Sequence, residues 1–292
     1  MRVLLFKLVL RLFALLPLRV AHALGAGLGW LAWVLPTGLR DTTLTNLRLC
    51  FPDMPEPERR RLARASLRET GKTFTEMGAM WFWSPAQVYG LVRETVNEDM
   101  AVDLYRQGRG LIVLIPHLGS WEMCNLHYAQ DFPLTALYRP PRMAGLQRMI
   151  QQSRERVGAR LVPTTAGGVK GLYAALGRHE VVGILPDQDP GRGGGVFAPF
   201  FGIPASTMTL VPRLAQRTGA PVVLIYGERL PKGRGYRTHF HPVGDAIRDA
   251  DPAVAAAALN RGVETCVREC PSQYQWSYRR FKTRPEGEES LY

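Results

Sequence analysis

Cysteine is scarce in this chain. There are four cysteines among 292 residues, and only Cys266 and Cys270 lie close together, one helical turn apart. Small disulfide-stabilised domains have many more cysteines for their length, so this pattern argues against a disulfide framework. Cys124 lies near a histidine motif and is a conceivable nucleophile, but its position on an expected helix favours burial in the core.

Several catalytic and metal-binding motifs are also missing. The chain has neither a GxSxG nucleophile elbow nor an HExxH metalloprotease motif. Its glycine-rich segment 191–195 lacks the GxxxxGK[ST] pattern of a phosphate loop, so we expect a mobile loop there. His239 and His241 alternate along an expected strand, but no cysteine or carboxylate cluster with zinc spacing accompanies them. We therefore expect neither a metal nor a cofactor.

Acidic residues are few relative to basic ones. The chain has 25 Asp and Glu against 37 Lys and Arg, a formal net charge of +12. Such a surface attracts nucleic acid, anionic lipid headgroups or acidic carrier proteins. Zinc-finger spacing, an RNA-binding aromatic signature and a basic heptad region are all absent, so we expect no nucleic acid as partner. Several arginines lie on an expected helix over residues 58–80, either as a solvated face or as a binding surface for lipid phosphates or an acidic carrier protein: Arg59, Arg60, Arg61, Arg64 and Arg68.

Residues 1–40 are the most apolar part of the chain. The first half is interrupted by Lys7, Arg11, Arg19 and His22. The leucines between them lie on one apolar side of a helix, which is typical of an interfacial helix. Residues 20–39 contain no acidic or basic charge apart from His22 and are about long enough to cross a bilayer, although glycines and a proline weaken that interpretation. We expect a membrane anchor, either one span or an in-plane helical hairpin. A pair of core helices is the alternative, and the early charges disfavour a cleaved signal peptide.

The rest of the chain, residues 41–292, is expected to form one catalytic domain. Its apolar runs predict strands at residues 111–115, 134–138, 160–162, 181–185 and 222–226, with helical segments between most of them. Strands that alternate with helices indicate an α/β fold with a largely parallel central sheet flanked by helices. Residues 236–241 alternate and predict an antiparallel edge strand, and residues 251–270 predict a final helix.

The strand at 111–115 leads into the chain's most distinctive motif. Pro116 ends the strand, His117 and Gly119 predict a tight turn, and Ser120 is a suitable N-cap for a helix from residue 121. His117 then lies at the carboxyl end of a parallel strand, where α/β proteins bind ligands. Glu122, in the first turn of the helix, could hydrogen-bond one imidazole nitrogen and leave the other to accept a proton from an alcohol. Without further context, a purely structural role for this pair is equally reasonable.

The sequence HLGSWE at residues 117–122 resembles the HX4(D/E) motif of glycerolipid-type acyltransferases. The longer string resembles the lipid A late (secondary) acyltransferases of Gram-negative bacteria, because NLRLCFP at 46–52, YRP at 138–140, RERVG at 154–158 and DQDP at 187–190 follow in that family's order. The similarity covers roughly residues 4–282. It implies an enzyme at the cytoplasmic face of the inner membrane, in contact with membrane phospholipids, that transfers a fatty-acyl chain from acyl carrier protein to a hydroxyl of a lipid A precursor. His117 with Glu122 would be the general base, and the attack would be direct, without an acyl-enzyme.

The resemblance also implies roles for residues outside this motif. An arginine of the 154–158 block assists the reaction centre in the family, and Arg154 or Arg156 matches it; such a group could bind the donor's phosphopantetheine, bind an acceptor phosphate or stabilise the oxyanion. Arg139 is expected to bind substrate. Asp187 and Gln188 follow a buried strand at the same rim as His117 and could orient its loop or bind acceptor sugar hydroxyls, although a simple turn explains them equally well. Apolar residues 196–202 could line an acyl-chain channel.

Two other functions remain compatible with these residues. The same chemistry could act on a lysophospholipid or on another glycolipid, such as a phosphatidylinositol mannoside. Alternatively, a non-catalytic basic protein could use the +12 surface to bind membranes or nucleic acid. In that case binding would weaken with salt as phosphate contacts are screened, and no acyl transfer would occur.

Overall fold

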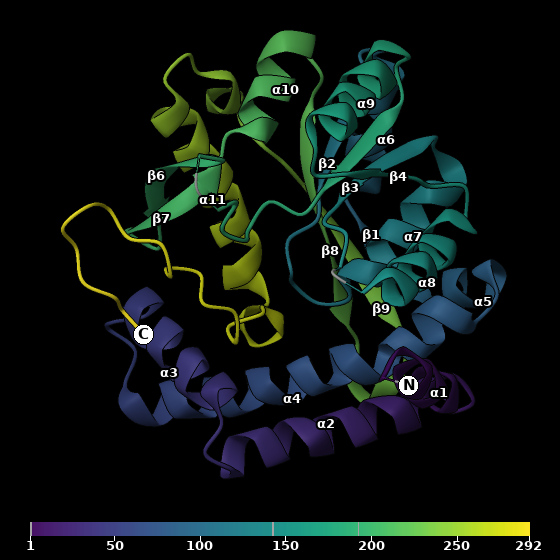
Figure 1. Ribbon diagram of the computed structural model, residues 1–292, viewed down its shortest axis with the longest axis vertical. Coiled ribbons are helices and arrows are strands. Elements are labelled where there is room, and N and C mark those ends of the chain that lie inside the picture. The colour runs from purple at the N-terminus through teal and green to yellow at the C-terminus, as the bar shows by residue number, and fades with distance from the viewer. Residues whose placement is uncertain (1, 142, 192) are drawn as a thin grey trace.

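The computed structural model describes residues 2–141, 143–191 and 193–292, and at its centre is a seven-stranded sheet (Figure 1). The strands lie in the order β1 (Val92–Val96), β9 (Tyr236–Pro242), β8 (Val222–Arg229), β2 (Leu111–Leu114), β5 (Val181–Ile184), β3 (Leu134–Tyr138) and β4 (Arg160–Pro163). All neighbouring pairs are parallel except β8 and β9. The α/β class and the largely parallel sheet expected from the sequence are confirmed.

Strand β2 is buried on both faces, as its unbroken apolar run predicts. Ile112 and Leu114 pack into the hydrophobic core on one face, whereas Leu111, Val113 and Ile115 pack into the core on the other. Full burial of such a side chain stabilises the fold by about 1.5–3 kcal/mol. The two cores therefore hold the end of β2, and the loop that follows it, in a rigid position.

Helices cover both faces of the sheet. One core takes side chains from α9 (Ala166–Gly177), α10 (Leu210–Thr218) and α11 (Pro252–Glu269), and the other from α6 (Glu98–Arg106), α7 (Trp121–Asp131) and α8 (Ala144–Glu155). The short helix α5 (Pro85–Tyr89) packs on α7, and the 3-10 helices are η1 (Pro231–Gly233), η2 (Asp245–Arg248) and η3 (Pro271–Gln273). This layering places the carboxyl ends of β2 and β5 side by side.

The predicted edge strand and the predicted channel lining both need correction. The 236–241 segment forms β9 and pairs antiparallel with β8 as expected, but it is not an edge strand, because β1 adds to its other side in parallel. Residues 196–202 belong to a separate hairpin of β6 (Gly195–Phe200) and β7 (Ile203–Met208). In that hairpin Phe200 packs into the core, so it is not free to line a channel. In the glycine-rich segment, residue 192 lies outside the described residues.

The amino-terminal helices pack beside the sheet as a separate layer. Helix α2 (Leu18–Val34) runs along α4 (Glu56–Phe82), flanked by α1 (Arg2–Ala14) and α3 (Gly38–Cys50) (Figure 1). Glycines allow the close approach, since a Cβ on Gly29 would lie 2.1 Å from the carbonyl oxygen of Leu67 and one on Gly71 would lie 2.0 Å from that of Gly25. Only glycine, which has no Cβ, fits at these positions of the helix crossing.

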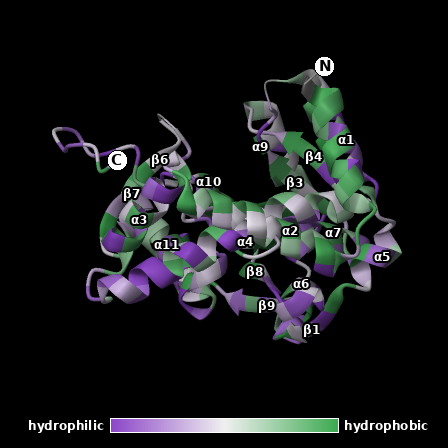
Figure 2. Cartoon of the chain, turned by 90° about the horizontal axis from the view of Figure 1, so that it is seen from below, coloured by the Kyte–Doolittle hydropathy of each residue, from purple (hydrophilic) through white to green (hydrophobic). Residues whose placement is uncertain are grey.

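No helix in the described part of the chain is by itself long and apolar enough to cross a membrane. Helices α2 and α3 reach that length and hydropathy together, but they meet at a bend of 82°. Large apolar side chains are nevertheless exposed along α1 and α2, and α1 is coloured mainly as hydrophobic in Figure 2. They are Leu4, Leu5, Leu8, Leu12, Val20, Leu24, Leu28, Trp30, Leu31 and Val34. We call this set the apolar face.

Candidate active site

The loop between β2 and α7 forms the turn that the sequence predicts. Gly119 has φ +60°, and a Cβ there would lie 2.0 Å from the carbonyl oxygen of Gly227 on β8, so the turn requires glycine at this position. Ser120 precedes α7 at the N-cap position, but its side chain makes no capping hydrogen bond. The loop is instead fixed by its backbone: Ser120 N–H donates to Gly227 at 2.8 Å, and Gly119 N–H donates to Gln273 at 3.1 Å.

His117 is held by a buried carboxylate from the neighbouring strand end. Asp187 Oδ1 lies 2.8 Å from His117 Nδ1, and Asp187 Oδ2 accepts the backbone N–H of His117 at 2.9 Å. Burial raises the pKa of Asp187, but the charge and hydrogen bonds of His117 outweigh it and hold the pKa below its usual range. Asp187 is therefore ionised and can only accept, so Nδ1 carries the imidazole proton.

This geometry corrects the expected pairing of His117 with Glu122. Glu122 accepts two hydrogen bonds from Arg154, at 2.7 Å from Nε and 2.8 Å from Nη2, and a third from Trp81 Nε1 at 3.0 Å. The pairing prediction was wrong because it used residues close in sequence. Strands β2 and β5 are parallel neighbours, so the loops after their carboxyl ends lie side by side. Asp187, from the loop after β5, is therefore the carboxylate that contacts the imidazole.

Glu122 and Arg154 form a largely buried ion pair that links α7 to α8. Burial raises the pKa of Glu122, but the positive charge and hydrogen bonds of Arg154 outweigh it and the pKa falls below its usual range. Side-chain exposure is 7% for Glu122 and 17% for Arg154, so each charge depends on the other for compensation. The pair fixes the first turn of α7 directly behind the His117 loop.

The second imidazole nitrogen of His117 faces one amide donor. Gln188 Nε2 lies 3.2 Å from His117 Nε2 and donates to Gln275 Oε1 at 3.2 Å. Gln275 N–H also donates to the carbonyl of His117 at 3.0 Å. Because an amide nitrogen can only donate, Nε2 presents a lone pair, which agrees with a proton on Nδ1. The ring of Trp121 lies against the imidazole, with centroids 5.0 Å apart.

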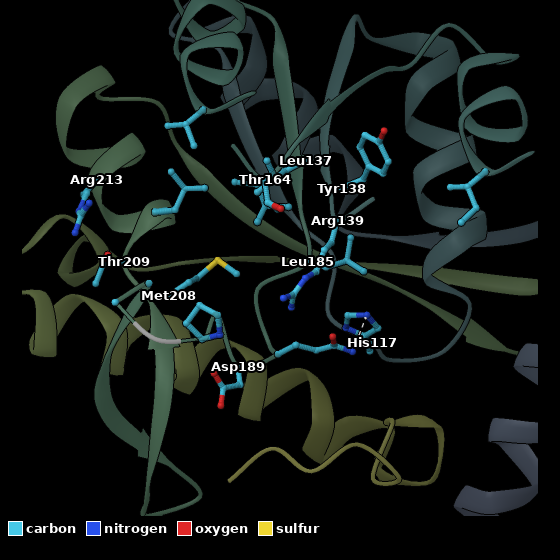
Figure 3. A pocket seen from close by; sticks show the side chains of 18 of the residues that line it. His117, Leu137, Tyr138, Arg139, Thr164, Leu185, Asp189, Met208, Thr209 and Arg213 are labelled. Carbon is cyan, nitrogen blue, oxygen red and sulfur yellow. Dashed lines mark hydrogen bonds between the residues drawn. The ribbon is translucent and has the colours of Figure 1, made fainter. Parts of the chain in front are cut away.

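A cavity of about 640 Å³ opens in front of His117 (Figure 3). Arg139, Arg154 and Gln188 line it together with His117, so the structure brings four of the predicted site residues to one space. Asp187 lies behind the imidazole rather than in the lining. Arg213, which the sequence analysis did not single out, adds a further guanidinium. The remaining lining is mainly apolar, from Leu137, Ile150, Val169, Ile184, Leu185, Met208 and Leu210.

Arg156 lies outside this cavity lining. Its Nη2 donates to the carbonyl oxygens of Met80 at 2.8 Å and Trp83 at 2.9 Å, at the end of α4. These carbonyls have no partner inside their own helix, so Arg156 satisfies them and ties α8 to α4. Of the two arginines that matched the family's reaction-centre arginine, only Arg154 faces the cavity.

The tertiary structure adds a carboxylate to the histidine pair on β9. Ligand atoms of His239, His241 and Glu269 lie within 4.8 Å of one another, a spacing that could hold a metal ion. Sequence spacing missed Glu269 because it comes from the end of α11. The groups also contact one another directly: His241 Nε2 lies 3.1 Å from Glu269, and Tyr226 donates its hydroxyl to Glu269 at 2.8 Å.

Comparison with known proteins assigns the chain to a family. The sequence model for bacterial lipid A biosynthesis acyltransferases matches residues 2–283. The chain belongs to this family. It is 33% identical over 285 residues to the lipid A biosynthesis lauroyltransferase of Escherichia coli K12, which covers 97% of this chain and 92% of that protein. It is therefore an acyltransferase.

Two further relatives come from the same bacterium. The lipid A biosynthesis palmitoleoyltransferase of E. coli K12 is 32% identical over 288 residues, covering 97% of this chain and 92% of that protein. The lipid A biosynthesis myristoyltransferase is 26% identical over 278 residues, covering 94% and 85%. The names of these relatives specify three different acyl chains, so family membership does not select the chain length that this acyltransferase uses.

Proposed function

We propose that this acyltransferase moves a fatty-acyl group from an acyl carrier protein thioester to a hydroxyl of a lipid A precursor, with His117 as the general base. The observation that carries the proposal is the imidazole's orientation. Asp187 holds the proton on Nδ1, and the lone pair of Nε2 faces a cavity with an apolar lining and several guanidinium groups. A base, an anion-stabilising group and space for an acyl chain are the parts that acyl transfer needs.

In the proposed reaction, the acceptor hydroxyl donates its proton to His117 Nε2 as its oxygen attacks the thioester carbonyl. The tetrahedral intermediate then collapses, its C–S bond breaks, and the imidazolium returns the proton to the departing thiolate. The products are an acyl ester and a free carrier thiol. Asp187 stabilises the imidazolium between the two steps. General-base assistance of this kind accelerates transfer by about 10²–10⁴-fold.

Arg154 is the residue placed to stabilise the negative charge on the carbonyl oxygen. It lines the same cavity as His117, and its two hydrogen bonds to Glu122 fix the guanidinium plane. Glu122 therefore positions Arg154 in this proposal and does not contact the base. Arg139 and Gln188, also in the lining, supply donors for phosphate or sugar groups of the substrates.

We infer a placement at the cytoplasmic surface of the inner membrane, and the apolar face supports the contact with a membrane. It extends over α1 and α2, and Leu4 and Leu5 expose 72% and 61% of their surface. Many large apolar side chains exposed on neighbouring turns of a helix are typical of a site that contacts a membrane or a partner. Residues 1–40 would then lie in the interface as in-plane helices, in contact with membrane phospholipids, and present the rest of the chain to lipid acceptors.

The direct test is transfer by purified protein with acyl carrier protein and acyl-CoA donors, against lipid A precursor and lysophospholipid acceptors. We expect transfer to the lipid A precursor, preferentially from the carrier protein, and a loss of about 10²-fold or more in kcat for His117→Ala. His179→Ala is the matched control, because His179 is exposed and does not line the cavity. Near-normal turnover by His117→Ala would refute the role of His117 as general base. Transfer only to lysophospholipid would show that the acceptor is not a lipid A precursor.

A further inference from the structure

A second cavity, of about 380 Å³, lies between α2, α4 and the η1 turn. Four basic side chains line it: Arg19 from α2, Arg68 and Lys72 from α4, and Lys232 from η1. Glu69 is the one carboxylate in the lining, and it is paired with Lys72. The lining therefore carries a clear excess of positive charge, which favours an anionic ligand.

The floor of this cavity does not offset that charge. His22 lines the cavity and contacts the buried carboxylate of Glu76 at 2.9 Å. Glu76 also accepts hydrogen bonds from Arg229, at 2.6 and 2.8 Å, and from the hydroxyl of Tyr236 at 2.9 Å. The negative charge of Glu76 is thus compensated inside the protein, and the exposed cations remain available to a ligand.

The cavity borders the apolar face along α2. Arg19, Ala23 and Ala26 line the cavity, whereas Val20, Leu24, Leu28 and Leu31 are exposed on the adjacent side of the same helix. At 100° per residue, Val20 lies about 100° around the helix from Arg19, and Leu24 lies about 100° from Ala23, so the cavity and these apolar side chains occupy neighbouring sides of α2. A ligand with an anionic head in the cavity could therefore extend apolar tails along the leucines.

We propose that this cavity binds the phosphodiester headgroup of an anionic membrane glycerophospholipid. Guanidinium and ammonium groups are the usual protein partners of phosphate, and basic clusters beside a membrane-facing helix bind anionic headgroups. The site is separate from the catalytic cavity, with which it shares no lining residue. The inference rests on the membrane placement proposed above, because the apolar face must meet the lipid tails. Bound lipid would fix how α2 and α4 lie on the bilayer.

The test measures binding in a non-ionic detergent, where no charged surface attracts the protein non-specifically. Short-chain phosphatidylglycerol is titrated into the purified protein by calorimetry, with short-chain phosphatidylcholine and glycerol phosphate as parallel ligands. We expect phosphatidylglycerol to bind most tightly. Equal binding of phosphatidylcholine, or binding of glycerol phosphate as tight as that of the lipid, would overturn the proposal, since either result removes the anionic lipid as the ligand.

Variants locate the site. Arg68→Ala and Lys232→Asn should each weaken phosphatidylglycerol binding about tenfold, as expected for loss of a hydrogen bond between charged groups. Asparagine suits position 232 because its φ is 61°, in the left-handed region. Arg61→Ala is the matched control: Arg61 is exposed, lies seven residues before Arg68 on the same face of α4, and does not line the cavity. Equal losses in Arg61→Ala and Arg68→Ala would refute the site.

The two proposals fail separately. His117→Ala should bind phosphatidylglycerol as the unsubstituted protein does, because His117 lies in the other cavity. If that variant keeps its transferase activity while Arg68→Ala loses lipid binding, the mechanism is wrong and the lipid site stands. If His117→Ala loses activity and phosphatidylglycerol does not bind to the unsubstituted protein, the lipid site is wrong and the mechanism stands.

Discussion

Asp187→Asn tests the central contact of the proposed site with a change of very few atoms. Asp187 accepts from two N–H groups of His117, the imidazole Nδ1 and the backbone nitrogen. The backbone N–H cannot change its role, so the asparagine oxygen must face it. The asparagine NH₂ then faces Nδ1, where only an acceptor is compatible. The imidazole proton moves to Nε2, and the lone pair that faces the cavity is lost.

The expected effect follows from this tautomer change. Without a lone pair on Nε2, general-base assistance disappears, and kcat should fall by about 10²–10⁴-fold, equivalent to about 2.7–5.4 kcal/mol of transition-state stabilisation. KM should change little, because Asp187 is not part of the cavity lining. The assay is steady-state transfer from acyl carrier protein to the lipid acceptor, with thermal unfolding measured on the same preparation.

Asp189→Asn is the matched control for this prediction. Asp189 is buried two residues further along the same loop, and it accepts from Gly191 N–H at 2.7 Å and from the hydroxyl of Thr283 at 2.5 Å without contacting His117. Because Asp189 itself lines the cavity, the two variants are compared by kcat and not by KM. We expect its kcat to fall by less than about tenfold. If Asp187→Asn folds normally and turns over like the unsubstituted enzyme, or if both variants lose activity equally, the reasoning from the tautomer is refuted.

Three further predictions concern the framework of the site. Glu122→Gln should lower the free energy of unfolding by about 3 kcal/mol, measured by urea denaturation, because Arg154 loses its anionic partner; a change within error would contradict the ion pair. The pKa of Glu122 is lower in the folded state, so the ion pair contributes its full stability above the unfolded pKa of about 4.3 and loses it as the pH falls through the lower folded value. The stability of Glu122→Gln should therefore depend less steeply on pH below about pH 4 than that of the unsubstituted protein. An unchanged slope would argue against this linkage. Gly119→Ala should lower the free energy of unfolding by about 1–3 kcal/mol or more, because residue 119 has a positive φ and lies against the Gly227 carbonyl. Gly177→Ala is the control: open space surrounds Gly177, so its stability should change by less than about 1 kcal/mol. Similar melting temperatures for the two variants would contradict the close approach at Gly119.

Local sequence patterns predicted the parts of the site that depend on neighbours along the chain. The unbroken apolar run before His117 predicted a strand buried on both faces, and alternate residues of β2 do reach the two cores. The glycine at 119 predicted a tight turn, which the positive φ confirms. Such predictions succeed because burial and backbone geometry leave a regular trace over a few residues.

Partner choice among charged residues could not be predicted in the same way. Arg154 and Arg156 are two residues apart, yet one faces the catalytic cavity and the other binds carbonyls at the end of α4. The helix period points them about 160° apart, but only the packing of α8 decides which direction is the cavity. Likewise, Glu269 reaches the β9 histidines only because α11 ends beside that strand.

The amino-acid sequence alone determined the fold class, the strand and turn that carry His117, and the family resemblance, because each of these is written in short-range periodicity or in an ordered set of motifs. Tertiary structure decided which carboxylate holds the imidazole. Glu122 is nearer along the chain, but the parallel pairing of β2 with β5 places Asp187 against His117. Glu122 instead accepts hydrogen bonds from Arg154. Hydrogen bonding depends on distance in space, which sequence separation does not measure.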